Sequence, residues 1–271
     1  MPQQHYGRAF GGSAPENYER YFVPVIPAPL AAELLDAVAP RPGEHVLDVA
    51  CGTGIVARLA AERVGPTGKV TGIDLTPGML EVAKNATPPG CAIDWHEASA
   101  EAMPLPEEAF DVVVCQLGLM FVPDKAAAVR EMNRVLVSGG RLGINVPGPT
   151  PPLFAVVDEA LQRHVGSEAA GFVGAVFSLN DPGEIRDLIA GAGFRDVRVR
   201  KSARKLPLPP PGEFLWQYVH STPLAGIMAK VDDQRRASLE REVVERLRPF
   251  VQDGGLIFEF DLAVATALKQ A

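Results

Sequence analysis

The sequence contains few cysteines, and none of them has a neighbour at a spacing typical of a disulfide framework. Cys51, Cys91 and Cys115 are the three cysteines in 271 residues, and no Cys-x-x-Cys pair occurs. This usage indicates reduced thiols and predicts a cytoplasmic protein. The histidines, cysteines and acidic residues also lack metal-ligand spacing, so we expect no metal site.

Long apolar runs and an excess of positive charge are missing as well. No run reaches the roughly 18 apolar residues needed to span a bilayer, so we expect no stable membrane insertion. Lysine and arginine number 26 against 33 acidic residues, and the net charge of -7 argues against a nucleic-acid partner. The sequence has no Gly-x-Ser-x-Gly or Gly-Lys-Ser/Thr motif, which argues against a triad hydrolase and a P-loop enzyme.

A glycine turn at residues 46–57 is the stretch around which the chain is organised. An apolar run typical of a buried parallel strand leads to Gly52 and Gly54, and an apolar helical face follows them. Glycine permits a sharp turn and a close approach of a ligand to the backbone. Backbone amides at such a turn favour a polar or anionic ligand group.

Two acidic residues bear on which ligand the turn takes. Gly52-x-Gly54-x-x-Ala57 fits the dinucleotide fingerprint, and Asp74 lies where a ribose-binding acid is expected. Asp48, just before the turn, would repel a pyrophosphate and favour a ligand that carries an ammonium and a sulfonium. S-adenosylmethionine (SAM) has both groups. A nucleotide-cofactor oxidoreductase of the NAD(P) type is the alternative.

Five ordered segments carry a resemblance to a known family. The chain resembles the class I SAM-dependent methyltransferases, nearest the ubiquinone/menaquinone-biosynthesis-like (methyltransferase type 11) group. The matching segments are residues 48–54, 72–80, 100–106, 110–114 and 131–142. They cover the part of the chain expected to bind the cofactor, and they say little about the last third.

The resemblance implies a set of SAM-binding residues. Asp48 would support the glycine loop and the methionine ammonium, Asp74 would bind the ribose hydroxyls, and Gln116 would position the methionine end. Ala50, Gly52 and Gly54 would present their backbone groups to SAM. The adenine ring would be held by Leu75, Met79, Ser99 and Ala100. The family usually has aspartate at position 99, and a serine hydroxyl there predicts a weaker adenine contact.

Alternating strands and helices predict an α/β fold. We expect a Rossmann-like, doubly wound, seven-stranded sheet with helical cap insertions; the resemblance implies that the last strand runs antiparallel between the fifth and sixth. The expected parts are N-terminal lid helices (1–40), a SAM-binding core (41–148), and a C-terminal part (149–271) with substrate-capping insertions at about 150–180 and 207–253.

Several local features have specific expectations. Gly139-Gly140 is expected to separate a helix from the fifth strand, and the proline run at 206–211 to form a rigid connector. Residues 213–228 are expected to form one helix. The apolar residues at 172–177 are expected in a flexible setting.

Candidate acceptor residues are aromatic or sulfur-containing. Tyr18 and Tyr21 would touch the methionine part of SAM or the substrate, or else pack against the sheet edge. Met120 and Phe121 would floor an apolar pocket. In the second insertion His220 is the candidate general base, and the pocket-lining candidates beside it are Trp216 and Tyr218.

These observations together predict an enzyme. We expect a SAM-dependent methyltransferase that transfers a methyl group to a small apolar or aromatic acceptor, at oxygen, carbon or nitrogen, and releases S-adenosylhomocysteine. The oxidoreductase is one alternative, and a SAM-binding protein without catalysis is another. The expected partner is a small-molecule acceptor, and the expected assembly is a monomer or a homodimer.

Overall fold

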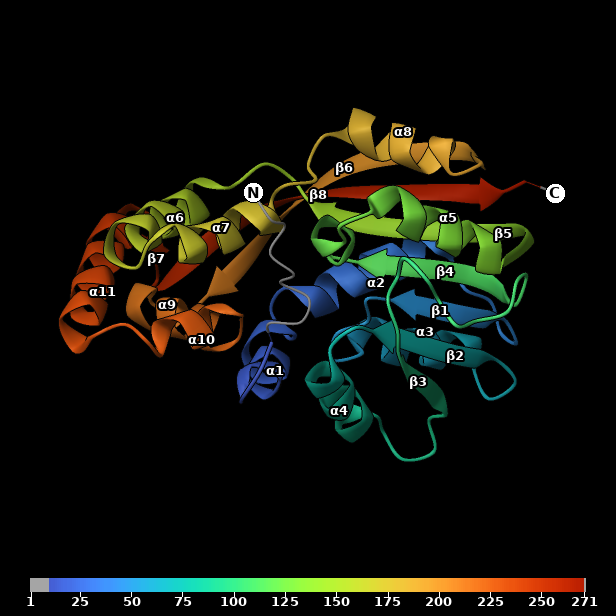
Figure 1. The fold of residues 1–271 in the computed structure, drawn as a ribbon, viewed down its shortest axis with the longest axis horizontal. Helices are drawn as coiled ribbons and strands as arrows, with labels where there is room; N and C mark the ends of the chain where they lie inside the picture. Colours follow the sequence, from blue (N-terminus) through green and yellow to red (C-terminus); the bar gives the residue numbers. More distant parts are fainter. Residues whose placement is uncertain (1–9, 271) are drawn as a thin grey trace.

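The computed structural model describes residues 10–270, so residues 1–9 of the expected lid segment lie outside the described residues. One mixed sheet organises the chain (Figure 1). Its strands are β1 (His45–Val49), β2 (Lys69–Asp74), β3 (Ile93–Glu97), β4 (Phe110–Gln116), β5 (Leu136–Pro147), β6 (Phe194–Leu208), β7 (Val251–Gln252) and β8 (Gly255–Lys269).

The order of the strands confirms the expected topology. It is β3-β2-β1-β4-β5-β8-β6, and the short β7 pairs with β8 as an addition to the seven expected strands. The pairs from β3 to β5 are parallel, and β8 is antiparallel to both β5 and β6. The carboxyl ends of β1, β2 and β4 therefore meet at one edge, where ligands bind in open α/β sheets.

Helices cover both faces of the sheet. On one face α2 (Pro27–Val38) and α3 (Ile55–Val64) share a core with Val46 and Val112; on the other α5 (Lys125–Val135) and α8 (Pro182–Gly191) share one with Leu47 and Val113. Successive side chains of a strand point to opposite faces of the sheet, so neighbouring valines and leucines of one strand join different cores. The remaining N-terminal elements are α1 (Ala14–Asn17), η2 (Tyr18–Phe22), α4 (Pro77–Ala86) and η3 (Leu119–Phe121).

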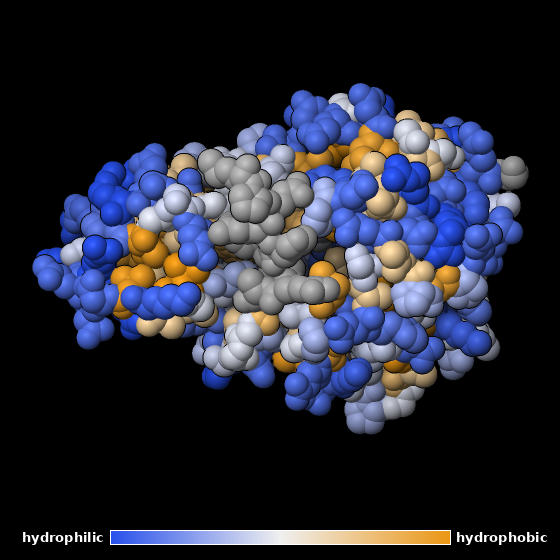
Figure 2. Space-filling view, viewed as in Figure 1, coloured by the Kyte–Doolittle hydropathy of each residue, from blue (hydrophilic) through white to orange (hydrophobic). Residues whose placement is uncertain are grey.

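A group of helices from the second half lies beyond one end of the sheet (Figure 1). The long strands β6 and β8 run from the core into this group. Its members are α6 (Pro152–His164), α7 (Ser167–Val176), α9 (Pro211–His220), α10 (Leu224–Met228), α11 (Asp233–Leu247) and η4 (Arg248–Phe250). Their apolar residues join the core formed by α2 and α3. Most of the face in Figure 2 is hydrophilic, with a hydrophobic patch over this helical group.

Four local expectations were wrong. Gly139-Gly140 lies inside β5, because the strand starts directly after α5 and the extra residues form a bulge opposite β4. Leu206–Leu208 belongs to β6, which tolerates Pro207 because it is an edge strand. Pro223 separates α9 from α10. Residues 167–176 form the helix α7, whose buried side includes Phe172.

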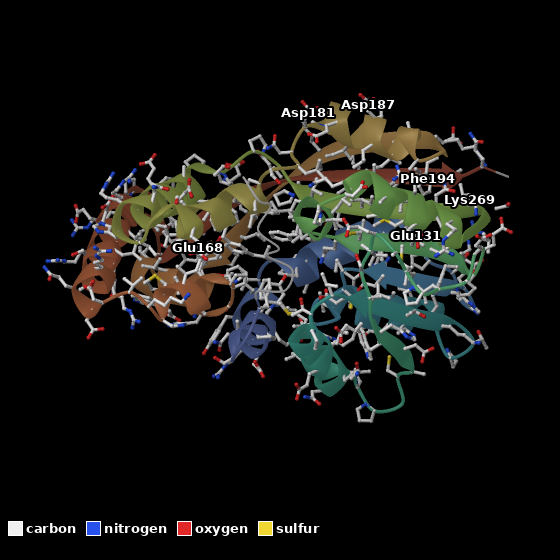
Figure 3. The ribbon with its side chains drawn as sticks, in the orientation of Figure 1. Glu131, Glu168, Asp181, Asp187, Phe194 and Lys269 are labelled. Carbon is white, nitrogen blue, oxygen red and sulfur yellow. The ribbon has the colours of Figure 1, made fainter. Side chains whose placement is uncertain are left out.

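The end of β8 is tied to the start of β5. Lys269 lies beside α5 in Figure 3, and its ammonium donates hydrogen bonds to the carbonyl of Leu136 at 2.7 Å and to that of Arg134 at 3.4 Å. Phe194, at the start of β6, pairs with Lys269 across the sheet. These contacts hold the end of β8 between β5 and β6.

Within residues 10–270 no single helix is both long and apolar enough to cross a membrane. One bent pair, Ala14–Phe22 with Pro27–Val38, reaches the required length and composition only jointly, and the two parts meet at 72°.

Candidate active site

The glycine turn lies at the carboxyl end of β1, as expected. Ala50, Gly52 and Gly54 have φ angles of 55°, 54° and 84°, the left-handed region that favours glycine. A Cβ placed on Gly52 would meet nothing within 4 Å, so the backbone here borders open space. Ala50 adopts this conformation although it is not glycine, and such local strain is concentrated at functional sites.

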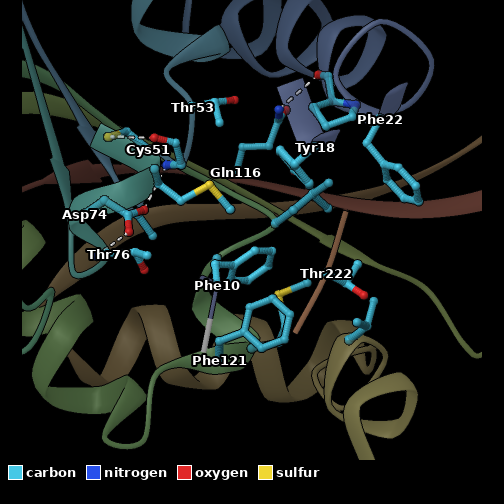
Figure 4. A pocket seen from close by; sticks show the side chains of 18 of the residues that line it. Phe10, Tyr18, Phe22, Cys51, Thr53, Asp74, Thr76, Gln116, Phe121 and Thr222 are labelled. Carbon is cyan, nitrogen blue, oxygen red and sulfur yellow. Dashed lines mark hydrogen bonds between the residues drawn. The ribbon is translucent and has the colours of Figure 1, made fainter. Parts of the chain in front are cut away.

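Asp74 joins the end of β2 to the glycine turn. Its carboxylate accepts hydrogen bonds from the amide of Gly52 at 2.8 Å and from that of Thr76 at 2.9 Å. Figure 4 shows both side chains, Asp74 and Thr76, at the same wall of the cavity. Burial raises the pKa of Asp74, and the bonds from the two amides oppose that rise. The carboxylate therefore has a fixed position beside the turn.

Asp48 is fully buried and has one free oxygen. Its Oδ2 accepts a hydrogen bond from the amide of Ala57 at 3.0 Å, whereas Oδ1 has no partner among the described residues. Burial, aided by the negative charge of Asp74, raises the pKa of Asp48 to about 8. A buried carboxylate with an unpaired oxygen is suited to a cationic ligand group, which would stabilise its ionised form.

One cavity runs from the glycine turn to the helical group. Most of the residues expected at the site line it: Asp48, Ala50, Gly52, Asp74, Leu75, Met79, Ser99, Ala100, Gln116, Tyr18, Met120, Phe121 and Tyr218. The lining is polar at the strand ends and apolar toward the helices.

Four of the expected residues do not line this cavity. Gly54 is turned toward Trp95. Tyr21 lies under the guanidinium of Arg20, which is 5.2 Å from the ring centroid. Trp216 and His220 stack on each other at 5.8 Å and line a second hollow, where the His220 side chain is exposed. The structure therefore places the candidate base outside the cavity.

Gln116 lines the cavity, but both ends of its amide are engaged. Its Nε2 donates to the carbonyl of Pro27 at 3.0 Å, and its Oε1 accepts from Nδ2 of Asn145 at 3.0 Å. Asn145 is itself fully buried and accepts a bond from the amide of Leu117 through Oδ1. The pair ties β4 and β5 to the start of α2. The sequence analysis missed Asn145, for which an asparagine within an apolar strand was the available signal.

Glu101 is a second residue that the sequence analysis missed. It lines the cavity beside Ser99, whose hydroxyl donates to the Glu101 carboxylate at 3.2 Å. The amide of Asp124 donates to the other carboxylate oxygen at 2.7 Å. The family usually has aspartate at position 99. Here position 99 is a serine, and the carboxylate of Glu101 lies next to it.

The end of the cavity away from the glycine turn is lined by aromatic rings. Phe121 stacks on Phe172 with ring centroids 6.1 Å apart, and Phe154 packs edge to face against Tyr218 and Phe258 at 5.3 Å. The complete set of lining rings is Phe10, Tyr18, Phe22, Phe121, Phe154, Phe172, Phe177, Tyr218, Phe258 and Phe260. We call this part of the cavity the aromatic chamber. Its rings come from segments far apart in the sequence.

The N-terminal segment borders both parts of the cavity. Phe10, Tyr18 and Phe22 line it, and the first two face Phe121 and Gln116 in the close view of Figure 4. On the side of the glycine turn Glu19 forms an ion pair with Arg58 of α3 at 2.6 Å. Arg58 also donates to the carbonyl of Thr53 in the glycine turn. On the helical side Nδ2 of Asn17 donates to the carbonyl of His220 at 3.2 Å.

The residues at the polar end fit SAM. Gly52 leaves room for a ligand against its backbone, Asp48 offers an unpaired buried oxygen to a cation, and Asp74 stands at the strand end beside both. Within residues 10–270 no group of three or more histidine, cysteine, aspartate or glutamate side chains is placed to hold a metal ion. The three cysteines are unpaired, and Cys51 and Cys115 are buried.

Comparisons with known proteins agree with this geometry. Residues 47–144 match the family model described as "Methyltransferase domain". Nocamycin O-methyltransferase of Saccharothrix syringae is 34% identical over 253 residues, which cover 88% of this chain and 90% of the relative. Demethylmenaquinone methyltransferase of Staphylococcus aureus is 34% identical over 172 residues, which cover 59% of this chain and 71% of the relative.

The fold is shared with solved structures of low identity. A crystal structure of a protein from Bacillus halodurans matches with a TM-score of 0.58 at 22% identity, covering 89% of this chain and 99% of that one. The relatives do not favour the oxidoreductase alternative, nor the protein without catalysis. The chain belongs to the class I SAM-dependent methyltransferases of the ubiquinone/menaquinone-biosynthesis-like (methyltransferase type 11) group, and it is an enzyme that uses SAM to methylate a small molecule.

Proposed function

We propose that the acceptor is an apolar or aromatic molecule that occupies the aromatic chamber, next to SAM at the strand ends. The observation that carries this proposal is the continuity of the cavity from Asp48 and Asp74 to the rings of Phe154, Phe172 and Tyr218. Two ligands in one cavity can bring their reacting atoms into contact. Aromatic walls favour an acceptor with apolar surface to bury.

The polar end supports specific roles for its residues. Asp48 would face the methionine ammonium with its unpaired oxygen, and the backbone at Gly52 would border the ligand. Asp74, held at the end of β2 by the amides of Gly52 and Thr76, would bind the ribose hydroxyls through its carboxylate. Adenine would lie against Leu75 and Met79, with the remaining contacts from Ser99, Ala100 and Glu101.

The chain's main chemical contribution would be alignment. Bound SAM supplies an electrophilic methyl group on a sulfonium, and its leaving group is neutral. Asp48 and Asp74 would fix the cofactor end, while Met120 and Phe121 would hold the acceptor against it. Orientation of this kind accelerates a displacement without proton transfer. The position of His220 outside the cavity supports alignment over general-base catalysis by that residue.

The parts of the chain suggest how the cavity is covered. Residues 1–40 would form a lid, because the described part of this segment lines the cavity and bonds to both of its sides. The helices of the second half would cap the acceptor, since they supply Phe154, Phe172 and Tyr218. We further propose a cytoplasmic location, supported by three unpaired thiols, and a monomer or homodimer.

Calorimetric titration of the purified protein tests the cofactor site. SAM and S-adenosylhomocysteine should bind at micromolar concentration, and NAD should not. The acceptor is tested separately by formation of S-adenosylhomocysteine with a panel of phenols, naphthols and quinols, against a panel of sugars and amino acids of similar size. Turnover confined to the polar panel would overturn the proposed apolar acceptor and leave the cofactor assignment intact.

A further inference from the structure

Tyr218 lines the aromatic chamber and carries a buried hydroxyl group. The residue is 3% exposed, it lines the cavity, and its hydroxyl has no hydrogen-bond partner among the described residues. A buried polar atom without a partner destabilises a protein, and such groups in native structures need a specific explanation. A ligand in the cavity is one explanation.

The ring of Tyr218 is held firmly in place. Its neighbours are Phe154 at 5.3 Å, Phe22 at 5.8 Å, Phe214 at 6.1 Å and Phe172 at 6.2 Å between ring centroids. These rings come from η2, α6, α9 and α7, so the side chain is fixed from several directions. The ring therefore has a defined position among the aromatic side chains of the chamber.

The protonation state of Tyr218 suits hydrogen bonding to a ligand. Burial raises the pKa of its hydroxyl well above the ordinary value, and the negative charge of Asp158 adds to this rise. The hydroxyl therefore stays neutral around neutral pH, where it can both donate and accept a hydrogen bond. This state does not suit a general base.

We propose that the Tyr218 hydroxyl recognises a single hydrogen-bonding oxygen on the acceptor, so that the acceptor is a ring-bearing apolar molecule with a phenol, enol or carbonyl oxygen on its buried part. The rings would bind the apolar body, and Tyr218 would select the orientation in which the oxygen lies deep in the chamber. A site built around a hydrogen-bonding group discriminates against analogues that lack the matching oxygen. This inference rests on the proposed function, because it places the acceptor in the aromatic chamber.

A pair of probes of equal shape tests the proposal. The wild-type protein, saturated with S-adenosylhomocysteine, is titrated with 2-naphthol and with 2-methylnaphthalene, which has a methyl group in place of the hydroxyl. We expect the wild type to bind 2-naphthol about tenfold more tightly than 2-methylnaphthalene, the size of one buried hydrogen bond. In Tyr218→Phe, which removes one oxygen atom, this preference should disappear, while affinity for 2-methylnaphthalene is kept or rises.

Ser221 provides a matched control. Its hydroxyl is also fully buried and has no partner among the described residues, but Ser221 does not line the cavity. Ser221→Ala should therefore keep the preference for 2-naphthol. Both variants remove a buried unpaired hydroxyl, so both should unfold at or above the wild-type temperature.

The proposal is overturned by no preference for 2-naphthol in the wild type, by a preference that survives Tyr218→Phe, or by no binding of either probe. In each case, binding of S-adenosylhomocysteine and turnover with an apolar acceptor would still report independently on the proposed function. A loss of the preference in Ser221→Ala as well would assign the effect to the fold of α9, and would also count against a direct contact from Tyr218.

Discussion

The indole of Trp95 occupies the space into which a side chain on Gly54 would project. A Cβ on Gly54 would overlap Cη2 of Trp95, and one on Gly72 would overlap Cζ3 of the same ring. Trp95 lies on β3, Gly72 lies on the neighbouring β2, and Gly54, in the glycine turn, is the N-cap residue of α3. One aromatic ring therefore sets the glycine requirement at two positions, and the second glycine of the turn serves packing as well as backbone conformation.

Gly54→Ala should destabilise the protein for two separable reasons. The φ of +84° costs an alanine about 1–2 kcal/mol, and overlap with Trp95 should add about 1–3 kcal/mol. Gly90 is a matched control, because it has the same φ of +84° with nothing near its Cβ position, so Gly90→Ala should show the first cost alone. Urea unfolding of both variants measures the difference. Equal losses would show that Trp95 imposes no steric demand at Gly54.

The fold was largely predictable from the sequence, because short apolar runs, glycines and prolines mark most strand and helix ends directly. The position of the acidic residues at the strand ends was also predictable, because the carboxyl ends of parallel strands meet at one edge of the sheet. The aromatic chamber was not. Phe22, Phe154, Phe172 and Phe258 come from four separate segments, and only the packing of the helical group brings them together.

The hydrogen bonds of Gln116 were likewise not predictable from the sequence. Its partners, Pro27 and Asn145, are 89 and 29 residues away in the sequence, so no local pattern reveals them. Gln116→Leu should leave the Pro27 carbonyl and one Asn145 amide proton without their partner, at about 1–3 kcal/mol for each group. As a control, Gln217→Leu removes an exposed bond to Glu213 within α9 and should cost under about 0.5 kcal/mol. Similar losses of unfolding free energy in the two variants would contradict the structural role.

Asp74 should be essential for SAM binding. Asp74→Ala removes the carboxylate that accepts from Gly52 and Thr76, so it should loosen the turn and remove the proposed ribose contact. We expect SAM affinity to fall by a factor of about 10–100, since charge-assisted hydrogen bonds contribute about 1.5–3 kcal/mol. Calorimetry measures the affinity, and circular dichroism checks the fold. Unchanged affinity in a folded variant would rule out the proposed role.

Asp48 should make SAM binding depend on pH. The pKa of about 8 in the free protein means that the carboxyl group is largely protonated at pH 7, whereas a bound cation favours its ionised form. SAM affinity should therefore increase as pH rises toward about 8, and binding at pH 7 should release a proton. Titrations in two buffers of different ionisation enthalpy measure this release.

The same group gives a stability prediction of opposite sign. Because the pKa of Asp48 is higher in the folded state than its ordinary value of 3.8, the folded state binds more protons between about pH 4 and 8. The contribution of Asp48 to the free energy of unfolding should therefore decrease as pH rises through this range. Asp48→Asn should weaken both pH dependences, and a variant that keeps them in full would point to Asp74 as their source.

The ion pair between Glu19 and Arg58 connects the N-terminal segment with the glycine turn. The two side chains are 24% and 11% exposed, and Arg58 also donates to the Thr53 carbonyl. A second ion pair, between Asp36 and Arg63, likewise joins an N-terminal helix to α3, but its Asp36 side chain is 72% exposed. None of these four residues lines the cavity, but Arg58 bonds to Thr53, which does. Both pairs thus join an N-terminal element to α3, η2 in the first case and α2 in the second, and only the first is bonded to the glycine turn.

If residues 1–40 act as a lid, Glu19→Gln should speed the release of SAM. Loss of a partly buried, hydrogen-bonded ion pair is worth roughly 1 kcal/mol, or about fivefold in a dissociation rate. Asp36→Asn should leave that rate unchanged, because an exposed pair contributes little. Stopped-flow displacement of SAM by excess S-adenosylhomocysteine measures both rates. Because Asn17 also bonds to the His220 carbonyl, weakening the lid should speed the exchange of a bound acceptor as well. An unchanged SAM rate in Glu19→Gln would mean that this segment does not have to move for the cofactor to leave, and its rings would then serve as a fixed wall of the cavity.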